Sequence, residues 1–130
     1  MSQDYFSKAV SGIDSVGTTF NLTKKTSVTL SHSTTQYFNS SICTINFYLE
    51  SISSASTLTF MLSEDSNGDK ILIPDTSASI GTGLTTATSG NAVIQIDALL
   101  YSDVEEFYIF PKVDAGSCNI TQITITYRVN

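Results

Sequence analysis

The chain has 130 residues, only 14% of them charged, and its six basic and twelve acidic residues give a formal net charge of −6. This length fits a single domain that buries about 68% of the surface exposed by its unfolded chain. Nucleic-acid-binding proteins contact phosphates through Lys and Arg, so the acidic balance argues against a nucleic-acid partner. No apolar run is long enough to span a membrane, and the first residues, MSQDYFSKAV, lack the apolar core of a signal peptide. We therefore expect neither a membrane partner nor Sec-type export.

The first 18 residues are polar with scattered apolar positions. Val10, Ile13 and Val16 recur every three residues, as on one side of a helical turn, but the intervening Ser and Gly weaken a helix. Terminal segments of this composition are usually disordered unless something holds them. The sequence predicts an N-terminal arm over residues 1–18 that docks on its own domain or, as we favour, on a neighbouring subunit, and one domain over residues 19–130. The partner-binding residues expected in this arm are Tyr5, Phe6 and Val10.

Alternating apolar and polar residues predict short strands through the rest of the chain. The clearest is the hairpin at Thr57–Pro74, where Leu58, Phe60 and Leu62 share one face. Ile71 and Ile73 are expected to continue this apolar face on the second strand. Asn67-Gly68 supplies a tight turn with positive φ angles, and Pro74 is expected to end the ladder because it has no N–H to donate. Further strands are predicted around Phe20–Leu22, Val28–Leu30, Ile42–Glu50, Val93–Ala98, Glu106–Val113 and Ile120–Val129.

About eight short strands joined by turns, with little helix, indicate an all-β protein. We predict an antiparallel two-sheet β-sandwich of the jelly-roll type. The segment Ser77–Asn91 is small, polar and glycine-bearing, with at most a short strand around Ser79 and Ile80. Connections this long inside a compact domain are often functional or mobile, and we expect this one to contact neighbouring subunits.

The hairpin turn contains a D-x-N-x-D pattern formed by Asp65, Asn67 and Asp69, which is the opening of a calcium-binding loop. The full pattern fails, because Lys70 and Thr76 stand where a glycine and a bidentate glutamate belong. Two interpretations remain open. One is a partial Ca²⁺ site; the other, which we favour, is a solvated turn that uses Asp, Asn and Gly for conformational reasons. Apart from this Ca²⁺, no cofactor is expected.

No set of residues predicts catalysis, and we expect a protein that is not an enzyme. The single histidine, His32, lies in a polar connector with no nucleophile motif nearby. The acids Asp103, Glu105 and Glu106 could supply a glycosidase carboxylate pair, but a solvated acidic edge explains them better. The glycines near residues 81–83 lack the Gly-Lys-Ser/Thr of a phosphate loop.

Three aromatic residues, Tyr48, Tyr108 and Phe110, fall on the strand faces opposite the predicted core. Exposed aromatic residues on an outer sheet face serve as sugar-stacking platforms or as subunit contacts. A third interpretation is that a loop or a second layer covers them. The two cysteines, Cys43 and Cys118, match no metal or redox spacing and are expected to be buried thiols, unless neighbouring strands bring them together as a disulfide.

The short chain without a signal peptide, its Ser/Thr-rich composition and strands such as NITQITITYRV beside a glycine-rich loop resemble small β-sandwich proteins of bacteriophage particles, including head decoration proteins and tail-fibre modules. This resemblance implies a non-enzymatic virion structural protein, made in the host cytoplasm. It would bind other virion proteins and itself as a homo-oligomer such as a trimer.

The second half of the chain, from SEDSNGDKILIPD onward, is also similar to carbohydrate-binding jelly rolls. The alternative function is therefore a carbohydrate- or receptor-binding module. It would use the outer aromatic residues to bind a surface glycan, with Ca²⁺ at the Asp65 turn.

Overall fold

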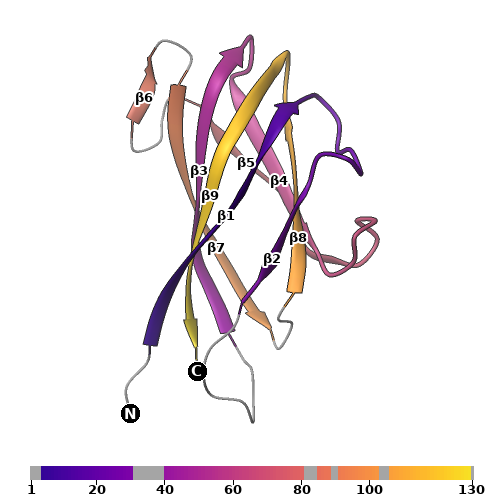
Figure 1. The fold of residues 1–130 in the computed structure, drawn as a ribbon, viewed down its shortest axis with the longest axis vertical. Helices are drawn as coiled ribbons and strands as arrows, with labels where there is room; N and C mark the ends of the chain where they lie inside the picture. The colour runs from indigo at the N-terminus through magenta and orange to yellow at the C-terminus, as the bar shows by residue number, and fades with distance from the viewer. Residues whose placement is uncertain (1–3, 31–39, 81–84, 89–90, 103–105, 130) are drawn as a thin grey trace.

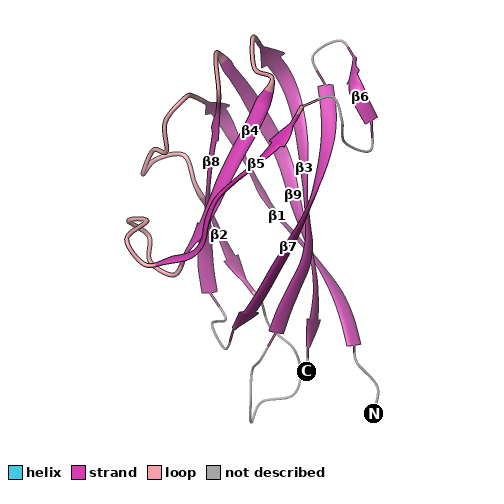
Figure 2. Ribbon diagram, turned by 180° about the vertical axis from the view of Figure 1, so that it is seen from behind, coloured by secondary structure: helices cyan, strands magenta, loops and turns pink. Residues whose placement is uncertain are grey.

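The computed structural model describes residues 4–30, 40–80, 85–88, 91–102 and 106–129, and these contain no helix, hence none that could cross a membrane. They form nine strands: β1 (Asp4–Val16), β2 (Thr26–Thr29), β3 (Ser40–Ser53), β4 (Thr57–Ser63), β5 (Ile71–Ser79), β6 (Thr85–Thr88), β7 (Asn91–Ser102), β8 (Glu106–Val113) and β9 (Ser117–Val129). One sheet has the order β1-β9-β3-β7-β6 and the other β2-β8-β4-β5, and the two sheets pack face to face (Figures 1 and 2).

The strand pairing confirms the jelly roll. The pairs β4–β5, β3–β7, β2–β8 and β1–β9 are nested within one another along the chain, and all four are antiparallel. They describe one long two-stranded ribbon that alternates between the two sheets. Wrapping this ribbon brings β9 beside β3 and β8 beside β4, which is the jelly-roll arrangement. The ninth strand, β6, is an addition at the free edge of β7.

The core lies between the two sheets and follows the predicted alternation. Leu58, Phe60 and Leu62 on β4 are fully buried, and Phe60 packs against Phe47 of β3 with 5.3 Å between ring centroids. On β9, the alternating residues Ile123, Ile125 and Tyr127 face the same core. Burying each such side chain stabilises the fold by about 1.5–3 kcal/mol.

The N-terminal segment belongs to the sandwich, which corrects the expectation of a separate arm over residues 1–18. β1 pairs with β9 from Asp4↔Val129 to Val16↔Cys118, and both Ile13 and Val16 are buried. The pairing depends on a close approach at Gly12, where a Cβ would lie 2.0 Å from the carbonyl oxygen of Ile120. The domain therefore begins with β1 rather than at residue 19.

The predicted hairpin forms, but its second strand differs from the expectation. The connection spans the seven residues Glu64–Lys70 and is longer than the predicted tight turn. Gly68 has the predicted positive φ, at 77°, but Asn67 does not. The prediction that Pro74 ends the ladder is wrong, because β5 continues to Ser79. Ile73 pairs with Leu62 and Thr76 with Phe60, so Pro74 and Asp75 together oppose a single residue of β4. This β-bulge on an edge strand is a place where a missing N–H is tolerated. Ile71, expected on the apolar side, is 53% exposed.

The strand predicted around Phe20–Leu22 is replaced by the connection between β1 and β2. The side-chain oxygen of Asn21 accepts hydrogen bonds from the N–H and the hydroxyl of Thr23, both at 2.8 Å. An Asn that bonds the backbone two residues ahead stabilises a turn. Leu22 is accordingly 54% exposed.

The two cysteines lie at opposite ends of the five-stranded sheet. Cys43 is adjacent to Thr44, which pairs with Thr126, and Cys118 lies eight positions earlier on β9. At 3.3 Å per residue the two positions are roughly 26 Å apart, whereas a disulfide needs Cα atoms within about 7 Å. Cys118 is a buried free thiol.

Candidate ligand-binding face

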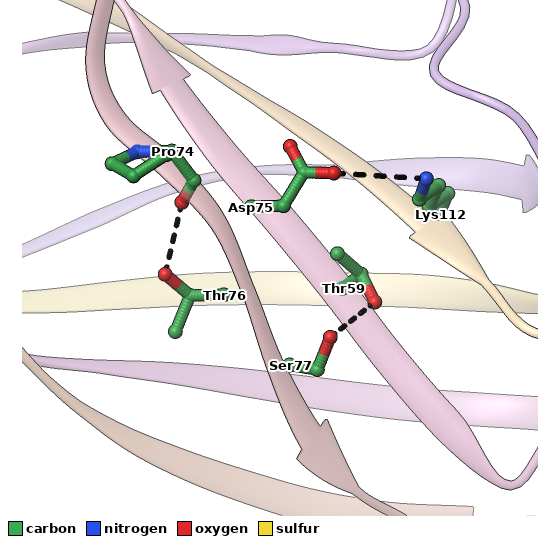
Figure 3. A network of polar contacts seen from close by, with 6 residues as sticks. All are labelled: Thr59, Pro74, Asp75, Thr76, Ser77 and Lys112. Carbon is green, nitrogen blue, oxygen red and sulfur yellow. Dashed lines mark hydrogen bonds and ion pairs between the residues drawn. The ribbon is translucent and has the colours of Figure 1, made fainter.

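The outer face of the four-stranded sheet carries a polar cluster at its centre. Thr59 of β4 pairs with Lys112 of β8 on one side and with Ser77 of β5 on the other, so the three residues form one row across the sheet. Asp75, two residues before Ser77 on β5, lies on the same face, where its carboxylate faces Lys112. We call Thr59, Asp75, Ser77 and Lys112 the polar cluster (Figure 3).

The members of the polar cluster contact one another while remaining accessible to solvent. The hydroxyls of Thr59 and Ser77 are 2.7 Å apart, and the Lys112 ammonium lies 3.8 Å from a carboxylate oxygen of Asp75 (Figure 3). The side chains of Asp75 and Lys112 are 58% and 31% exposed. An ion pair this exposed contributes about 0–1 kcal/mol to stability, so a ligand could replace it at little cost.

An aromatic ring borders the polar cluster. Lys112 Nζ lies 4.5 Å from the ring centroid of Phe20, in the connection between β1 and β2. The half-buried Phe20 ring thus lies beside the ammonium group of the polar cluster. Hydroxyls donate and accept hydrogen bonds, a carboxylate only accepts and an ammonium only donates. Together they match a ligand that carries many hydroxyl groups and some apolar surface.

Hydrogen bonds to one carboxylate oxygen of Asp65 hold the hairpin turn together. Its Oδ1 atom accepts hydrogen bonds from the N–H groups of Asp69 (2.8 Å) and Lys70 (2.9 Å) and from the hydroxyl of Ser63 (2.7 Å). These bonds, first that from Lys70, lower the pKa of Asp65 to about 2. Three donors directed at Oδ1 hold the turn together, which is the role that the turn interpretation gives to Asp65. The described part of the chain has no group of three or more His, Cys, Asp or Glu that could hold a metal ion. These bonds fit the turn interpretation, and the partial Ca²⁺ site at Asp65, Asn67 and Asp69 stays an untested prediction.

A loop covers Phe110, one of the two aromatic residues predicted on the outer face of β8, while Tyr108 is half-buried. Phe110 is only 1% exposed and packs beside Met61 under the loop at Glu64–Lys70. Lys25 fastens this loop: its Nζ donates to the carbonyl oxygen of Ser66 at 2.8 Å and lies 5.7 Å from the Tyr108 ring centroid and 5.8 Å from that of Phe110. The covering-loop interpretation thus applies to Phe110, which is not available to a partner.

The other predicted binding residues lie elsewhere. Tyr48 is half-buried on the outer face of the five-stranded sheet, opposite Gln122 and Val93. Phe6 is 36% exposed and stacks on Tyr127 with 5.6 Å between centroids. Val10 is half-buried against the core, and the side chain of Tyr5 lies outside the described residues. Of the six residues predicted to bind partners, the five whose side chains are described therefore do not form one surface.

Of the residues considered for catalysis, Glu106 alone lies in the described part of the chain. Glu106 is exposed at the start of β8. His32, Asp103, Glu105 and residues 81–83 lie outside the described residues.

Comparison with known proteins gives similarities of fold alone. No protein-family model matches the chain, and no curated protein matches it. Similar solved structures include an exo-β-1,3-galactanase from Phanerochaete chrysosporium (TM-score 0.46, 10% identity, 96% of this chain and 29% of that chain) and the C-terminal CBM6 of LamC, a laminarinase from Zobellia galactanivorans (TM-score 0.46, 12% identity, 96% and 99%). A third is a family two carbohydrate esterase from Cellvibrio japonicus (TM-score 0.39, 12% identity, 99% and 36%). The chain thus spans about a third of the galactanase and of the esterase.

Proposed function

We propose that this chain is a non-enzymatic carbohydrate-binding module and that its ligand lies across the polar cluster. The observation that carries the proposal is the row of Ser77, Thr59 and Lys112 across three adjacent strands, with Asp75 and the Phe20 ring beside it. A rigid sheet fixes the spacing of these groups better than a loop does, and such preorganisation reduces the cost of binding.

The charge of the cluster favours a neutral glycan. Asp75 and Lys112 neutralise each other, and the hydroxyls of Thr59 and Ser77 are uncharged. An acidic or phosphorylated glycan would need an excess of Lys or Arg, whereas the chain as a whole is acidic. A neutral sugar can bond its hydroxyls to Asp75 and Lys112 and place an apolar ring face toward Phe20.

The test is binding to a panel of neutral and acidic polysaccharides, measured by affinity gel electrophoresis and then by calorimetry on oligosaccharides of the best ligand. The intact chain should bind at least one neutral polysaccharide. Asp75→Ala should weaken that binding about tenfold or more, because a hydrogen bond to a charged group contributes about 1.5–3 kcal/mol. Ser77→Ala should have a smaller effect in the same direction.

The matched control is Glu106→Ala, which removes an exposed acid from the same sheet without touching the polar cluster. A chelator should leave binding unchanged, since Asp65 is occupied by N–H and O–H donors. If the intact chain binds no polysaccharide, or if Asp75→Ala and Glu106→Ala weaken binding equally, the proposal fails.

A structural subunit of a bacteriophage particle is our second candidate function. It is supported by the long unpaired edge of β1, with the exposed Phe6 upon it, because subunit assembly commonly uses such edges. The chain would then bind virion proteins or itself and be located in the virion. The test is sedimentation with particles that lack the chain: retention by the particles supports this candidate, and no retention argues against it.

A further inference from the structure

β1 presents the longest sheet edge in the described structure. It has 13 residues and is the outermost strand of the five-stranded sheet. One of its edges pairs with β9, and the opposite edge pairs with no described strand (Figure 1). From residue 4 to residue 11 the pairing with β9 runs one-to-one, without a register shift. The outward backbone groups of an edge strand can pair with a strand from another chain.

The remaining edges of the described structure are short or irregular. The edge of β7 that β6 leaves uncovered, beyond Val93, is irregular because the register of β7 with β3 shifts between Asp97 and Leu100. β2 and β6 have four residues each. β5 carries the bulge at Pro74–Asp75. The second half of β1 is also irregular, since its register shifts between Ile13 and Val16 and Ser15, at φ 54°, donates its N–H to the side chain of Asn119 at 2.8 Å. Bulges, prolines and short length all hinder strand addition, which leaves residues 4–11 of β1 as the open edge.

Two side chains of this open edge decide what can pair with it. Phe6 stacks on Tyr127 with one side of its ring and is 36% exposed. Lys8 is exposed and pairs with Ile125, a core residue, so its charge stands on the core side of the edge. A charge in that position discourages most strands from adding. A partner strand must therefore offer an acidic residue opposite Lys8.

We propose that the partner is a second copy of this chain, which adds its own β1 in antiparallel orientation with Phe6 opposite Phe6. In that register the aspartate at position 4 lies opposite Lys8 of the second copy, and the twofold symmetry repeats the pair on the other side. Tyr5 lies opposite Ser7. Opposite charges and facing aromatic residues on cross-strand positions both stabilise a strand pair. The result is one continuous sheet through both subunits, independent of any glycan bound at the polar cluster.

The charges also select this register over its neighbours. A twofold axis at Lys8 would place two lysines directly opposite each other, which destabilises the pair. An axis at Ser7 would place Lys8 opposite Phe6 and leave the charge unpaired. Only the register centred on Phe6 gives both lysines an acidic partner within residues 4–8.

A charge-swap experiment tests the proposal by light scattering over a concentration series. The intact chain should dimerise. Asp4→Lys and Lys8→Asp should each weaken dimerisation about tenfold or more, since both cross-strand pairs become like-charged. A mixture of the two variants should form a heterodimer, because every pair between them is again opposite in charge. The double variant Asp4→Lys/Lys8→Asp should dimerise alone.

Lys70→Asp is the matched control for the charge change, since Lys70 is exposed in the hairpin loop on the other sheet. It should dimerise as the intact chain does, and thermal unfolding should confirm that every variant is folded. An intact chain that stays monomeric throughout overturns the proposal. So does a dimer that neither single substitution weakens, or a mixture of the two variants that forms no heterodimer.

Discussion

Asp114 is bonded to Ser56 through both of its carboxylate oxygens. Oδ1 accepts the N–H of Ser56 at 2.8 Å, and Oδ2 accepts its hydroxyl at 2.6 Å, while Oδ1 also accepts the N–H of Thr57 at 2.9 Å. Asp114 follows β8, and Ser56 precedes β4. This carboxylate therefore closes one end of the β4–β8 pair, although neither residue belongs to a strand.

These bonds predict a dependence of stability on acid. The Ser56 hydroxyl first, and then the N–H groups of Ser56 and Thr57, lower the pKa of Asp114 to about 2. A carboxylate whose pKa falls on folding stabilises the native state at pH values above its pKa in the unfolded chain, near 3.9. This contribution to stability is lost as the pH falls through about 2. Asp114→Asn should lower stability at pH 7 and flatten the fall in stability between about pH 4 and pH 2. Urea unfolding across this range measures both effects, with Asp14→Asn, at an exposed position on β1, as the control. Equal pH profiles for the intact chain and Asp114→Asn would contradict this account.

Two glycines allow close backbone approaches that no other residue permits. At Gly12 an added Cβ would lie 2.0 Å from the carbonyl oxygen of Ile120, and at Gly116, with φ 67°, it would lie 1.8 Å from that of Ser53. Gly12→Ala and Gly116→Ala should each destabilise the protein by about 2 kcal/mol or more. Gly17→Ala is the control, because no atom lies within 4 Å of the added Cβ, and it should change stability by about 0.5 kcal/mol or less. Thermal or urea unfolding measures the stability of the three variants. If Gly12→Ala is as stable as the intact chain, β1 does not approach β9 this closely.

The loop at Glu64–Lys70 should depend on Lys25. Lys25→Ala removes the hydrogen bond to Ser66 and the ammonium above the rings of Tyr108 and Phe110. We expect a loss of about 1–3 kcal/mol in the local stability of the loop, from a charged hydrogen bond and a cation–π contact. Hydrogen exchange of the loop amides should become faster, while exchange in β9 should not change. Lys24→Ala is the matched control. If the loop amides exchange at the same rate in Lys25→Ala and Lys24→Ala, Lys25 does not hold the loop in place.

The fold could be predicted from sequence wherever strand alternation is regular. Leu58, Phe60 and Leu62 alternate without interruption and are buried as predicted. β1 was not predicted as a strand because its inward residues do not alternate regularly. Its register with β9 shifts between Ile13 and Val16, and these two buried residues are three positions apart. Such spacing resembles a helical turn when only the sequence is read. The irregular spacing of buried residues on β1 therefore led to the prediction of an N-terminal arm instead of a strand.

The polar cluster was missed for a related reason. Thr59 and Lys112 could be placed on outer faces from alternation, but nothing in the sequence states that β4 lies beside both β5 and β8. Taking Pro74 as the end of the ladder also removed Asp75 and Ser77 from the sheet. The bulge at Pro74–Asp75, which depends on the pairing with β4, restores both residues to the strand. Cross-strand register is a property of the assembled sheet, and the sequence indicates it only where turns are short.

The Cys118 thiol should be inert in the folded protein. It is 1% exposed at the edge of the core, and burial raises its pKa to about 11. Since the thiolate is the reactive form, iodoacetamide at pH 8 should leave Cys118 unmodified in the native chain and alkylate it after unfolding in urea. Peptide mass spectrometry separates Cys118 from Cys43 and so measures each thiol by itself. Because the two positions are too far apart to bridge, the intact mass after alkylation in urea without reductant should show both cysteines modified. Rapid native labelling of Cys118, or a chain that alkylates only after reduction, would mean that β9 does not pack as described.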